Sequence, residues 1–201
     1  MRIISGTFRS RTLEAPKGDK TRPTSDRARE TLFNILVNLV DLEDANVLDL
    51  FAGSGAFAFE ALSRGAESAT CVDSSADAIT AIKTNASKLG VDPKSFRLDV
   101  YKWLESAEGQ YDIIFADPPY DDPKLPEILV KSIVGSRLLT PDSIVIIEHR
   151  SGSELTIPDG VIRLKERSAG EAQFTFLKVR GSETETGDLP GDIRSDNERS
   201  S

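Results

Sequence analysis

The segment from Asn46 to Glu148 alternates short apolar runs with amphipathic stretches, and this alternation restricts the fold more than any other feature of the chain. The apolar runs have the length of strands, and the stretches between them have the spacing of helices. We expect strands at 47–51, 68–72, 96–98, 111–116 and 144–148, and helices at 56–63, 76–89, 101–107 and 126–134. Repeated strand–helix units predict an α/β protein whose parallel sheet carries helices on both faces.

Further apolar runs flank this alternating segment on both sides. Residues 161–165 and 174–179 are separated only by a polar loop, so they predict an antiparallel hairpin at the edge of the sheet. Residues 3–8 and 12–15 surround a short basic turn and predict a second hairpin near the N-terminus.

A helix is expected between the N-terminal hairpin and the first strand of the sheet. Thr24 or Ser25 can cap its start. Apolar residues recur at helical spacing and predict one buried stripe, formed by Ala28, Leu32, Ile35 and Leu39. This pattern places Arg27 and Arg29 on the other faces of the helix.

Composition and charge divide the chain into three parts. We expect a basic hairpin extension at 1–22, a single α/β domain at 23–180 and an acidic tail at 181–201. Residues 1–40 hold eight basic and four acidic residues, whereas the whole chain has a net charge of −8. Because the tail has almost no apolar residues, we expect it to be disordered. The basic end is compatible with RNA contact and equally with a solvated basic face.

Composition also excludes several classes of protein. The chain has one Cys and one His, which excludes a disulfide framework and an ordinary zinc site. Cys71 lies inside an expected strand and is interpreted as a core residue, and His149 follows an apolar run and is interpreted as structural. There is no signal-peptide core and no apolar run of membrane-spanning length. We therefore expect a cytoplasmic monomer that uses no metal.

The turn after the first expected strand has the features of a cofactor-binding turn. Its glycines let the backbone come close to a ligand at the start of a helix. A phosphate-binding loop would need a Lys-Ser/Thr pair and a dinucleotide site a third glycine, and both are missing. Asp49 precedes the glycines, repels phosphate and suits a ligand with an ammonium and a sulfonium group, which points to S-adenosylmethionine. The expected contacts are Asp49, Phe51, Ala52, Gly53, Ser54 and Gly55.

Acidic residues also follow the next two expected strands. Asp73 lies about twenty residues beyond the glycine turn, where a carboxylate can accept both ribose hydroxyls of an adenosyl group. Its structural alternative is an acid at the start of the following helix. Asp99 could accept the amino group of adenine, with Val100 beside the ring, or could be a solvent-exposed loop acid. All of these residues lie at the carboxyl ends of parallel strands, where this architecture binds ligands.

Asp117-Pro118-Pro119-Tyr120 stops the apolar run 111–116 abruptly. Because proline has no N–H, the turn keeps acceptors available: the carboxylate of Asp117 and a backbone carbonyl at Pro118. These two acceptors could bind the two N–H bonds of an exocyclic amine and direct its lone pair at a methyl donor, while Tyr120 stacks on the base. The turn therefore predicts methylation of an sp2 amine. Nothing in these four residues distinguishes guanine N2 from adenine N6.

Five segments taken together resemble the bacterial 16S rRNA guanine-N2 methyltransferase family of the RsmD type. They are 1–6 (MRIISG), 22–34 (RPTSDRARETLFN), 49–55 (DLFAGSG), 60–65 (EALSRG) and 117–120 (DPPY). The resemblance covers residues 1 to about 180, and 22–34 is its most specific segment. Two features depart from the family pattern: Asp73 stands where Glu is more frequent, and the acidic tail from Gly181 is additional.

The resemblance implies a class I methyltransferase fold, which is Rossmann-like and has a mostly parallel seven-stranded sheet with an antiparallel edge hairpin. It also implies S-adenosylmethionine as the donor and a guanine of 16S rRNA, within a small-subunit assembly particle, as the acceptor. The N-terminal hairpin is then expected to grip the RNA, with 22–24 near the cofactor and the target base. The expected RNA contacts are Arg9, Arg11, Arg22, Arg27 and Arg29.

Three other functions remain open from the sequence. A DNA adenine-N6 methyltransferase could use the same Asp117 turn, but such enzymes need a separate module to read bases in the major groove, and only about sixty residues separate the glycine turn from Asp117. A glutamine methyltransferase acting on protein faces the same amine chemistry, and the basic hairpin argues mildly against it. A non-catalytic RNA-binding or ribosome-assembly factor could retain the fold.

Overall fold

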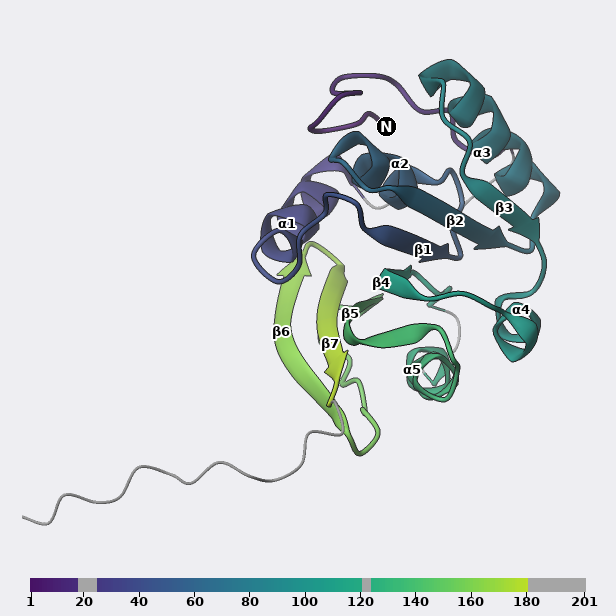
Figure 1. Cartoon of the computed structure of the whole chain (residues 1–201). Helices are drawn as coiled ribbons and strands as arrows, with labels where there is room; N and C mark the ends of the chain where they lie inside the picture. Colours follow the sequence, from purple (N-terminus) through teal and green to yellow (C-terminus); the bar gives the residue numbers. More distant parts are fainter. Residues whose placement is uncertain (18–24, 121–123, 181–201) are drawn as a thin grey trace, which may run out of the picture.

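A computed structural model of the chain describes residues 1–17, 25–120 and 124–180. Within them, seven strands form one sheet in the order β3-β2-β1-β4-β5-β7-β6 (Figure 1). The strands are β1 (Asn46–Leu50), β2 (Ser68–Asp73), β3 (Lys94–Arg97), β4 (Tyr111–Ala116), β5 (Leu139–Arg150), β6 (Val161–Ala169) and β7 (Ala172–Val179). The helices are α1 (Asp26–Leu36), α2 (Ala56–Ser63), α3 (Ala76–Leu89), α4 (Val100–Ser106) and α5 (Leu125–Val134). Arg22 and the tail at 181–201 lie outside the described residues.

The predicted α/β fold is confirmed, including the hairpin at its edge. Strands β1 to β5 pair in parallel, and β7 lies antiparallel between β5 and β6. The main difference in limits is at β5, which begins at Leu139 instead of residue 144. It is longer because Leu139 pairs with Tyr111 at the start of β4, across an irregularity in the register.

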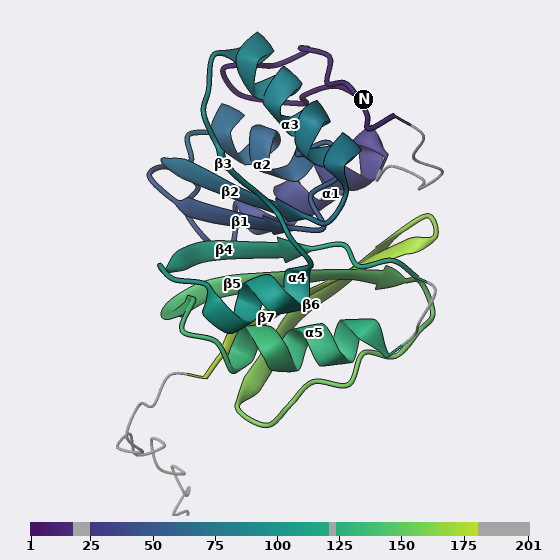
Figure 2. The same ribbon diagram turned by 90° about the vertical axis from the view of Figure 1, so that its right-hand side faces the viewer.

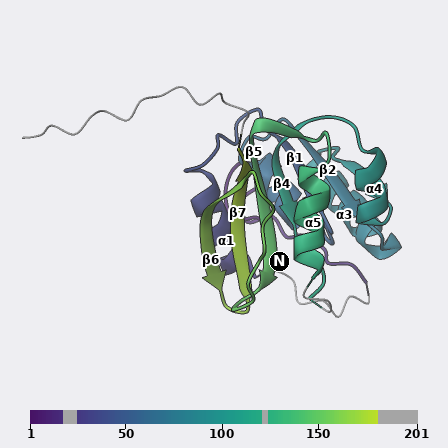
Figure 3. The same ribbon diagram turned by 90° about the horizontal axis from the view of Figure 1, so that it is seen from below.

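Helices cover both faces of the sheet (Figures 2 and 3). Helices α4 and α5 pack on one face and bury Trp103 and Leu129 against the strands. Helix α1 packs on the other face, where the ring of Phe57 stacks between Phe33 and Phe115 at centroid distances of 5.0 and 4.3 Å. Each such buried ring contributes roughly 2 kcal/mol through the area removed from water. None of the described helices has the length and apolar character needed to cross a membrane.

The N-terminal segment belongs to the same packed unit. Ile3 and Leu13 are buried in a third cluster with Phe59 of α2 and Ile82 of α3. The segment therefore forms a cover over these two helices, as Figure 1 shows at the top of the molecule.

The two strands predicted for the N-terminal segment do not form, and this prediction is corrected. Arg2 and Thr12 pair as an isolated antiparallel bridge, which is flanked by the N–H groups of Ile3 and Leu13 donating to the carbonyls of Arg11 and Met1 at 2.9 and 3.0 Å. Beyond this short pairing the backbone turns to α2, where the N–H of Thr7 donates to the carbonyl of Ser63 at 2.7 Å. Gly6 has a φ of 80°, and a Cβ there would lie 1.7 Å from that carbonyl oxygen, so only glycine permits the contact. The chain therefore folds back on itself around Arg2 and Thr12, while α2 supplies the acceptors for residues 4–8 that would have extended the first strand.

The carboxylate of Glu60 on α2 joins three separate segments of the chain. Its oxygens accept the backbone N–H groups of Ile4 at 2.7 Å and Ser5 at 3.1 Å, and the Nε–H of Arg64 at 2.8 Å. The side chain is fully buried, and Nε of Arg29 on α1 lies 3.9 Å from it. Because a buried carboxylate must be paired and hydrogen-bonded, these contacts hold the N-terminal segment and α1 against α2.

Helix α1 begins after Ser25, one of the two predicted caps, whose hydroxyl accepts a first-turn N–H at 3.1 Å. Arg29, by contrast, is not on an open face: it is 2% exposed. Its guanidinium donates to the carbonyl of Arg2 and, at 3.0 Å, to the carboxylate of Asp26. The prediction that Arg29 contacts RNA is therefore corrected, because partners within the protein occupy it. Arg27 is exposed.

Replacing Glu60 by Ala should lower the free energy of unfolding by about 3 kcal/mol, because buried N–H groups and guanidinium groups lose their acceptor. Urea unfolding should show a lower midpoint at an unchanged slope. Glu67→Ala, which removes an exposed acid, should change stability by no more than about 0.5 kcal/mol. Similar effects of the two substitutions would contradict the role given to Glu60.

Candidate active site at the carboxyl edge of the sheet

Residues near the carboxyl ends of four parallel strands are aligned across the sheet. Leu50 of β1 pairs with Val72 of β2 and with Ala116 of β4, which in turn pairs with Ile147 of β5. The next residue of each strand therefore lies at the same edge, which is lined by Asp73, Phe51, Asp117 and Glu148. The chain direction across the sheet reverses between β1 and β4, so this edge is a topological switch point, where α/β sheets bind ligands.

The glycine turn after β1 uses its two glycines for different reasons. The backbone is left-handed at Phe51 (φ 60°), Gly53 (φ 54°) and Gly55 (φ 74°). A Cβ at Gly55 would lie 2.8 Å from the ring of Phe59, so glycine is needed there for packing. A Cβ at Gly53 would meet nothing within 4 Å. Gly53 therefore faces open space and leaves its backbone accessible to a ligand.

Asp73 holds the glycine turn in place. Its two carboxylate oxygens accept the N–H groups of Gly53 and Ser75, both at 2.8 Å. The structural alternative for Asp73 was an acid that caps α3. Ser75 is the cap instead, because its hydroxyl accepts the N–H of Ala78 at 3.3 Å. A carboxylate oxygen has two lone pairs, so each oxygen of Asp73 can accept a further hydrogen bond.

Asp49 is the buried acid of this edge. It is 2% exposed, and its Oδ2 accepts the N–H of Ala58 in the first turn of α2 at 3.2 Å. It thereby caps a helix whose own N-cap residue, Gly55, has no side chain. Burial raises the pKa of Asp49 well above its usual range; the N–H of Ala58 lowers it, and the charge of Asp73 raises it further. A cation placed beside Asp49 would favour its ionised form.

The N-terminal segment and α3 support the glycine turn from behind. The buried amide of Asn85 donates to the carbonyls of Ser54 at 3.1 Å and Glu14 at 3.0 Å, and accepts the N–H of Glu14 at 2.8 Å. The Ser54 hydroxyl lies 3.2 Å from the sulfur of Met1. Ser54 and Ala52 are both buried, so their side chains face the protein.

The loop after β3 carries the two residues predicted to contact adenine. Asp99 is exposed and caps α4, where its carboxylate accepts the N–H of Lys102 at 3.1 Å. Val100 is buried in the core, so its side chain contributes packing. The N–H of Leu98 donates to the carbonyl of Asp73 at 3.1 Å, which ties this loop to the end of β2.

The Asp117 turn follows β4 at the centre of the edge. The N–H of Asp117 donates to the carbonyl of Leu50 at 3.4 Å, which joins the turn to β1 just before Phe51. Pro118 is buried and Pro119 is exposed. The turn is therefore anchored at its start and rigid at its prolines, next to the glycine turn.

Tyr120 contacts a residue that the sequence reasoning missed. Its hydroxyl donates to Oε1 of Glu148 at 2.8 Å, and the guanidinium carbon of Arg150 lies 5.9 Å from the centre of its ring. Burial, followed by the charges of Glu148 and Asp117, raises the pKa of Tyr120 far above its usual range. One signal in the sequence was available: Glu148 comes at the end of an apolar run, as Asp73 and Asp117 do.

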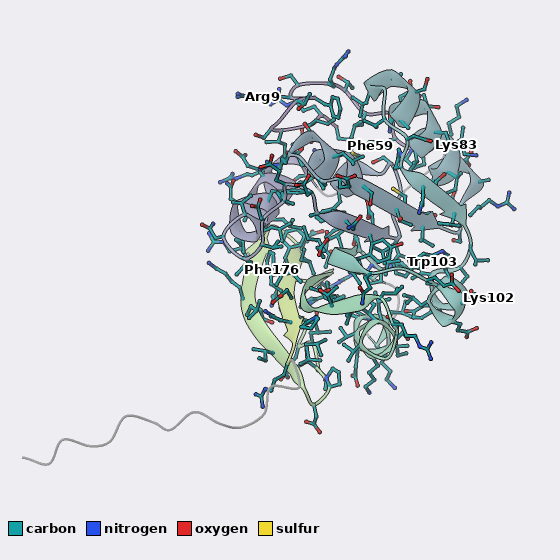
Figure 4. All side chains as sticks on the ribbon, in the orientation of Figure 1. Arg9, Phe59, Lys83, Lys102, Trp103 and Phe176 are labelled. Atoms are coloured by element: carbon teal, nitrogen blue, oxygen red, sulfur yellow. The ribbon has the colours of Figure 1, made fainter. Side chains whose placement is uncertain are left out.

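The arginines predicted to contact RNA lie on more than one side of the molecule. Arg9 and Arg11 are exposed, and the turn that holds Arg9 lies beside Ser63 at the end of α2 (Figure 4). The glycine turn precedes the start of the same helix. The tip of the N-terminal segment is therefore one helix length away from the carboxyl edge.

Two basic residues of β6 lie closer to α1 and were not predicted. Lys165 and Arg167 pair with Phe176 and Phe174 of β7, whose rings belong to the core beneath α1. Paired residues of antiparallel strands share a face, so both basic side chains lie on the α1 face of the sheet. Both are exposed, and neither forms an ion pair within the part of the chain that the structure describes.

The remaining candidates have structural environments. The ring nitrogens of His149 contact the hydroxyls of Ser153 at 3.0 Å and Thr175 at 2.9 Å, and burial lowers its pKa. Cys71 is fully buried inside β2, and burial raises its pKa. Across residues 1–17, 25–120 and 124–180, no group of three or more acidic, His or Cys residues could hold a metal ion.

The parallel sheet with β7 inserted antiparallel at one side, and an acid before a glycine turn after β1, define the class I methyltransferase fold. The chain belongs to the family described as Conserved hypothetical protein 95, whose model matches residues 1–178 and which is the RsmD family.

Individual relatives agree with this assignment. The chain is 38% identical to YlbH of Bacillus subtilis over 154 residues, covering 74% of this chain and 82% of that protein. It is 35% identical over 149 residues to the ribosomal RNA small subunit methyltransferase D of Escherichia coli, covering 74% of each. The solved structure of yhhF from Escherichia coli matches with a TM-score of 0.80 at 31% identity, over 90% of this chain and 99% of that one.

The raised pKa of Asp49 gives a testable dependence of stability on pH. The unfolded carboxyl ionises near pH 3.9, so above that value the folded state binds the extra proton and stability falls as pH rises toward the folded pKa. Asp49→Asn keeps an oxygen that can accept the N–H of Ala58. Because an amide does not ionise, the substitution removes this loss of stability at higher pH. At pH 7 the ligand-free variant should therefore be more stable than the wild type in urea unfolding.

The difference in the free energy of unfolding between Asp49→Asn and the wild type should narrow as pH falls toward 5. A variant that is less stable at pH 7, or a gap that does not depend on pH, would contradict the burial of an ionisable Asp49. Asp41→Asn, at an exposed acid, is the matched control and should show neither effect.

Proposed function

We propose that this chain transfers a methyl group from S-adenosylmethionine to the exocyclic N2 amine of a guanine in small-subunit (16S) rRNA. The observation that carries the proposal is the alignment of an acidic cofactor turn and the Asp117 turn at one edge of the sheet. The relatives named ribosomal RNA small subunit methyltransferase D support rRNA as the substrate. The acceptor is proposed to be a subunit assembly particle, with the enzyme acting as a cytoplasmic monomer.

The residues around the glycine turn fit the proposed donor. Gly53 offers open backbone, and Asp49 offers a buried carboxylate whose ionisation a cationic ligand would favour. Asp73 can accept ribose hydroxyls with the lone pairs that its two N–H partners leave. Asp99 is proposed to accept a hydrogen bond from the amino group of adenine. S-adenosylmethionine itself supplies a methyl group on a sulfonium centre.

The Asp117 turn would prepare the acceptor amine. If the Asp117 carboxylate and the Pro118 carbonyl accept its two N–H bonds, the nitrogen becomes pyramidal and its lone pair is directed at the methyl carbon. The C–N bond forms as the C–S bond breaks, and one amine proton then leaves to Asp117 or to water. Positioning and electrostatics carry this reaction, with no covalent enzyme intermediate. Tyr120 would stack on the flipped-out base.

RNA is proposed as the substrate in preference to DNA because of the elements that lie between the glycine turn and the Asp117 turn. Helices α2, α3 and α4 with strands β2 and β3 occupy the chain between the two turns, which leaves no segment there for a module that reads the major groove. A splayed-out base in folded RNA can be recognised without one. DNA adenine-N6 methylation is therefore the second candidate, and a role in subunit assembly could accompany either activity.

Basic residues on two sides are proposed to contact phosphates. One set is Arg9 and Arg11 on the N-terminal segment, and the other is Lys165 and Arg167 beside α1. Arg27 at the start of α1 extends the second set, and Arg22 is included on the sequence alone. These cations offset the acidic character of the rest of the chain where RNA would approach.

Asp117→Ala should lower kcat for methyl transfer to small-subunit RNA by at least about 100-fold, because the amine loses a charged acceptor in the transition state. The dissociation constant for S-adenosylmethionine, measured by calorimetry, should stay within about threefold of the wild type, since Asp117 does not hold the donor. Asp112→Ala, at the acid inside β4, serves as the control for transfer. Normal transfer by Asp117→Ala would rule out the proposed chemistry.

The double variant Lys165→Ala/Arg167→Ala should weaken RNA binding and lower the slope of log K against log salt by about 1 for each lost phosphate contact. Arg9→Ala/Arg11→Ala should behave in the same way. Lys83→Ala/Lys102→Ala removes exposed cations from α3 and α4 (Figure 4) and should leave the slope unchanged. Equal slopes in all three variants would refute the assigned surfaces.

A further inference from the structure

We propose that Glu148 is a positioning residue that fixes the ring of Tyr120 as the platform on which the acceptor base stacks. The proposal rests on the proposed function, since it assumes that Tyr120 receives a base. It adds a residue outside the Asp117 turn to the machinery of the reaction.

The backbone of Glu148 is held by β7 on one side and follows directly after a residue paired with β4 on the other. It ends the apolar part of β5, directly after Ile147, which pairs with Ala116 of β4. On its other side it pairs with Phe174 of β7, which is fully buried. A residue between two paired strands has little freedom, so Glu148 is a rigid support for a side chain of the neighbouring loop.

The link between the two residues is a hydrogen bond in a water-poor setting. Glu148 is 4% exposed, and its Oε1 accepts the hydroxyl proton of Tyr120 at 2.8 Å. Hydrogen bonds to an ionised acceptor are stronger than those between neutral groups. Burial and the charge of Glu148 also raise the pKa of Tyr120, so its hydroxyl stays protonated and keeps donating.

The ring needs such a link because it lies at the end of an exposed turn. Pro119 before it is exposed, and Tyr120 is only half-buried, so packing fixes this ring less than it fixes a core side chain. The guanidinium of Arg150 lies over the ring at 5.9 Å. With the hydroxyl fixed by Glu148 and Arg150 over one face, we expect the base to stack on the opposite face.

The burial of Glu148 is itself an argument for a role beyond stability. A carboxylate between two apolar strands loses its hydration, and an apolar residue would fill the position at lower cost. The same holds for Asp49, the other buried acid near this edge. Both lie close to the edge at which the ligands are proposed to bind.

Three variants test the pair: Tyr120→Phe, which removes only the hydroxyl, Glu148→Ala, and the combination of both. Each single variant should lower kcat by about tenfold, because a loosened ring misplaces the base. The affinity for S-adenosylmethionine should remain within twofold. The double variant should fall no further than the single ones, because both remove the same bond.

Glu148→Gln supplies the conservative control, since its amide oxygen can still accept the hydroxyl and should restore most of kcat. Glu127→Gln, which changes an acid on α5, should leave transfer unchanged. Additive losses in the double variant, or full activity of Tyr120→Phe, would overturn the proposal.

A second readout separates this proposal from the proposed function. The NMR signal of the Tyr120 ring carbon that bears the hydroxyl, assigned with Tyr120→Phe, should shift in Glu148→Ala and shift little in Glu148→Gln. An unchanged signal in Glu148→Ala would overturn the pair even if transfer occurs. If the signal shifts in Glu148→Ala but the wild-type protein does not methylate small-subunit RNA, the proposed function is overturned and the hydrogen bond between Tyr120 and Glu148 still stands.

Discussion

The parallel register of β2, β1, β4 and β5 is the constraint on which the site depends. Because Val72, Leu50, Ala116 and Ile147 form one row, four polar or aromatic residues that are far apart in the sequence end at a single edge. A slip of one residue in any of these strands would turn its last side chain to the other face. The apolar residues that fill both faces therefore fix the register and the chemistry together.

A second constraint explains why three of the family segments occur in one protein. Glu60 and Ser63 of the EALSRG segment bind the backbone of the N-terminal segment, and Glu60 also faces Arg29 of α1. The N-terminal segment in turn reaches the glycine turn through Asn85 and Met1. The glycine turn is thus supported by contacts that begin at the far end of α2.

The sequence predicted the elements whose signals are local. Helices α2 and α3 have the predicted limits, the edge hairpin is present, and Ser25 caps α1. The errors share one cause, which is a partner distant in the sequence. The predicted N-terminal strands shrink to a short pairing around Arg2 and Thr12 because α2 supplies the acceptors for residues 4–8, and Arg29 is buried because Arg2 and Asp26 surround it. Glu148 was missed because its partner, Tyr120, lies on another strand's loop.

The most direct measurement of the central claim is mass spectrometry of rRNA from cells that lack the gene. The account predicts the loss of one N2-methylguanine from small-subunit rRNA, its return with the wild-type gene, and no return with a gene encoding Asp117→Ala. An unchanged set of N2-methylguanines in small-subunit rRNA would contradict the account. Loss of N6-methyladenine from DNA instead would show that the same edge of the sheet acts on the alternative substrate, an adenine in DNA.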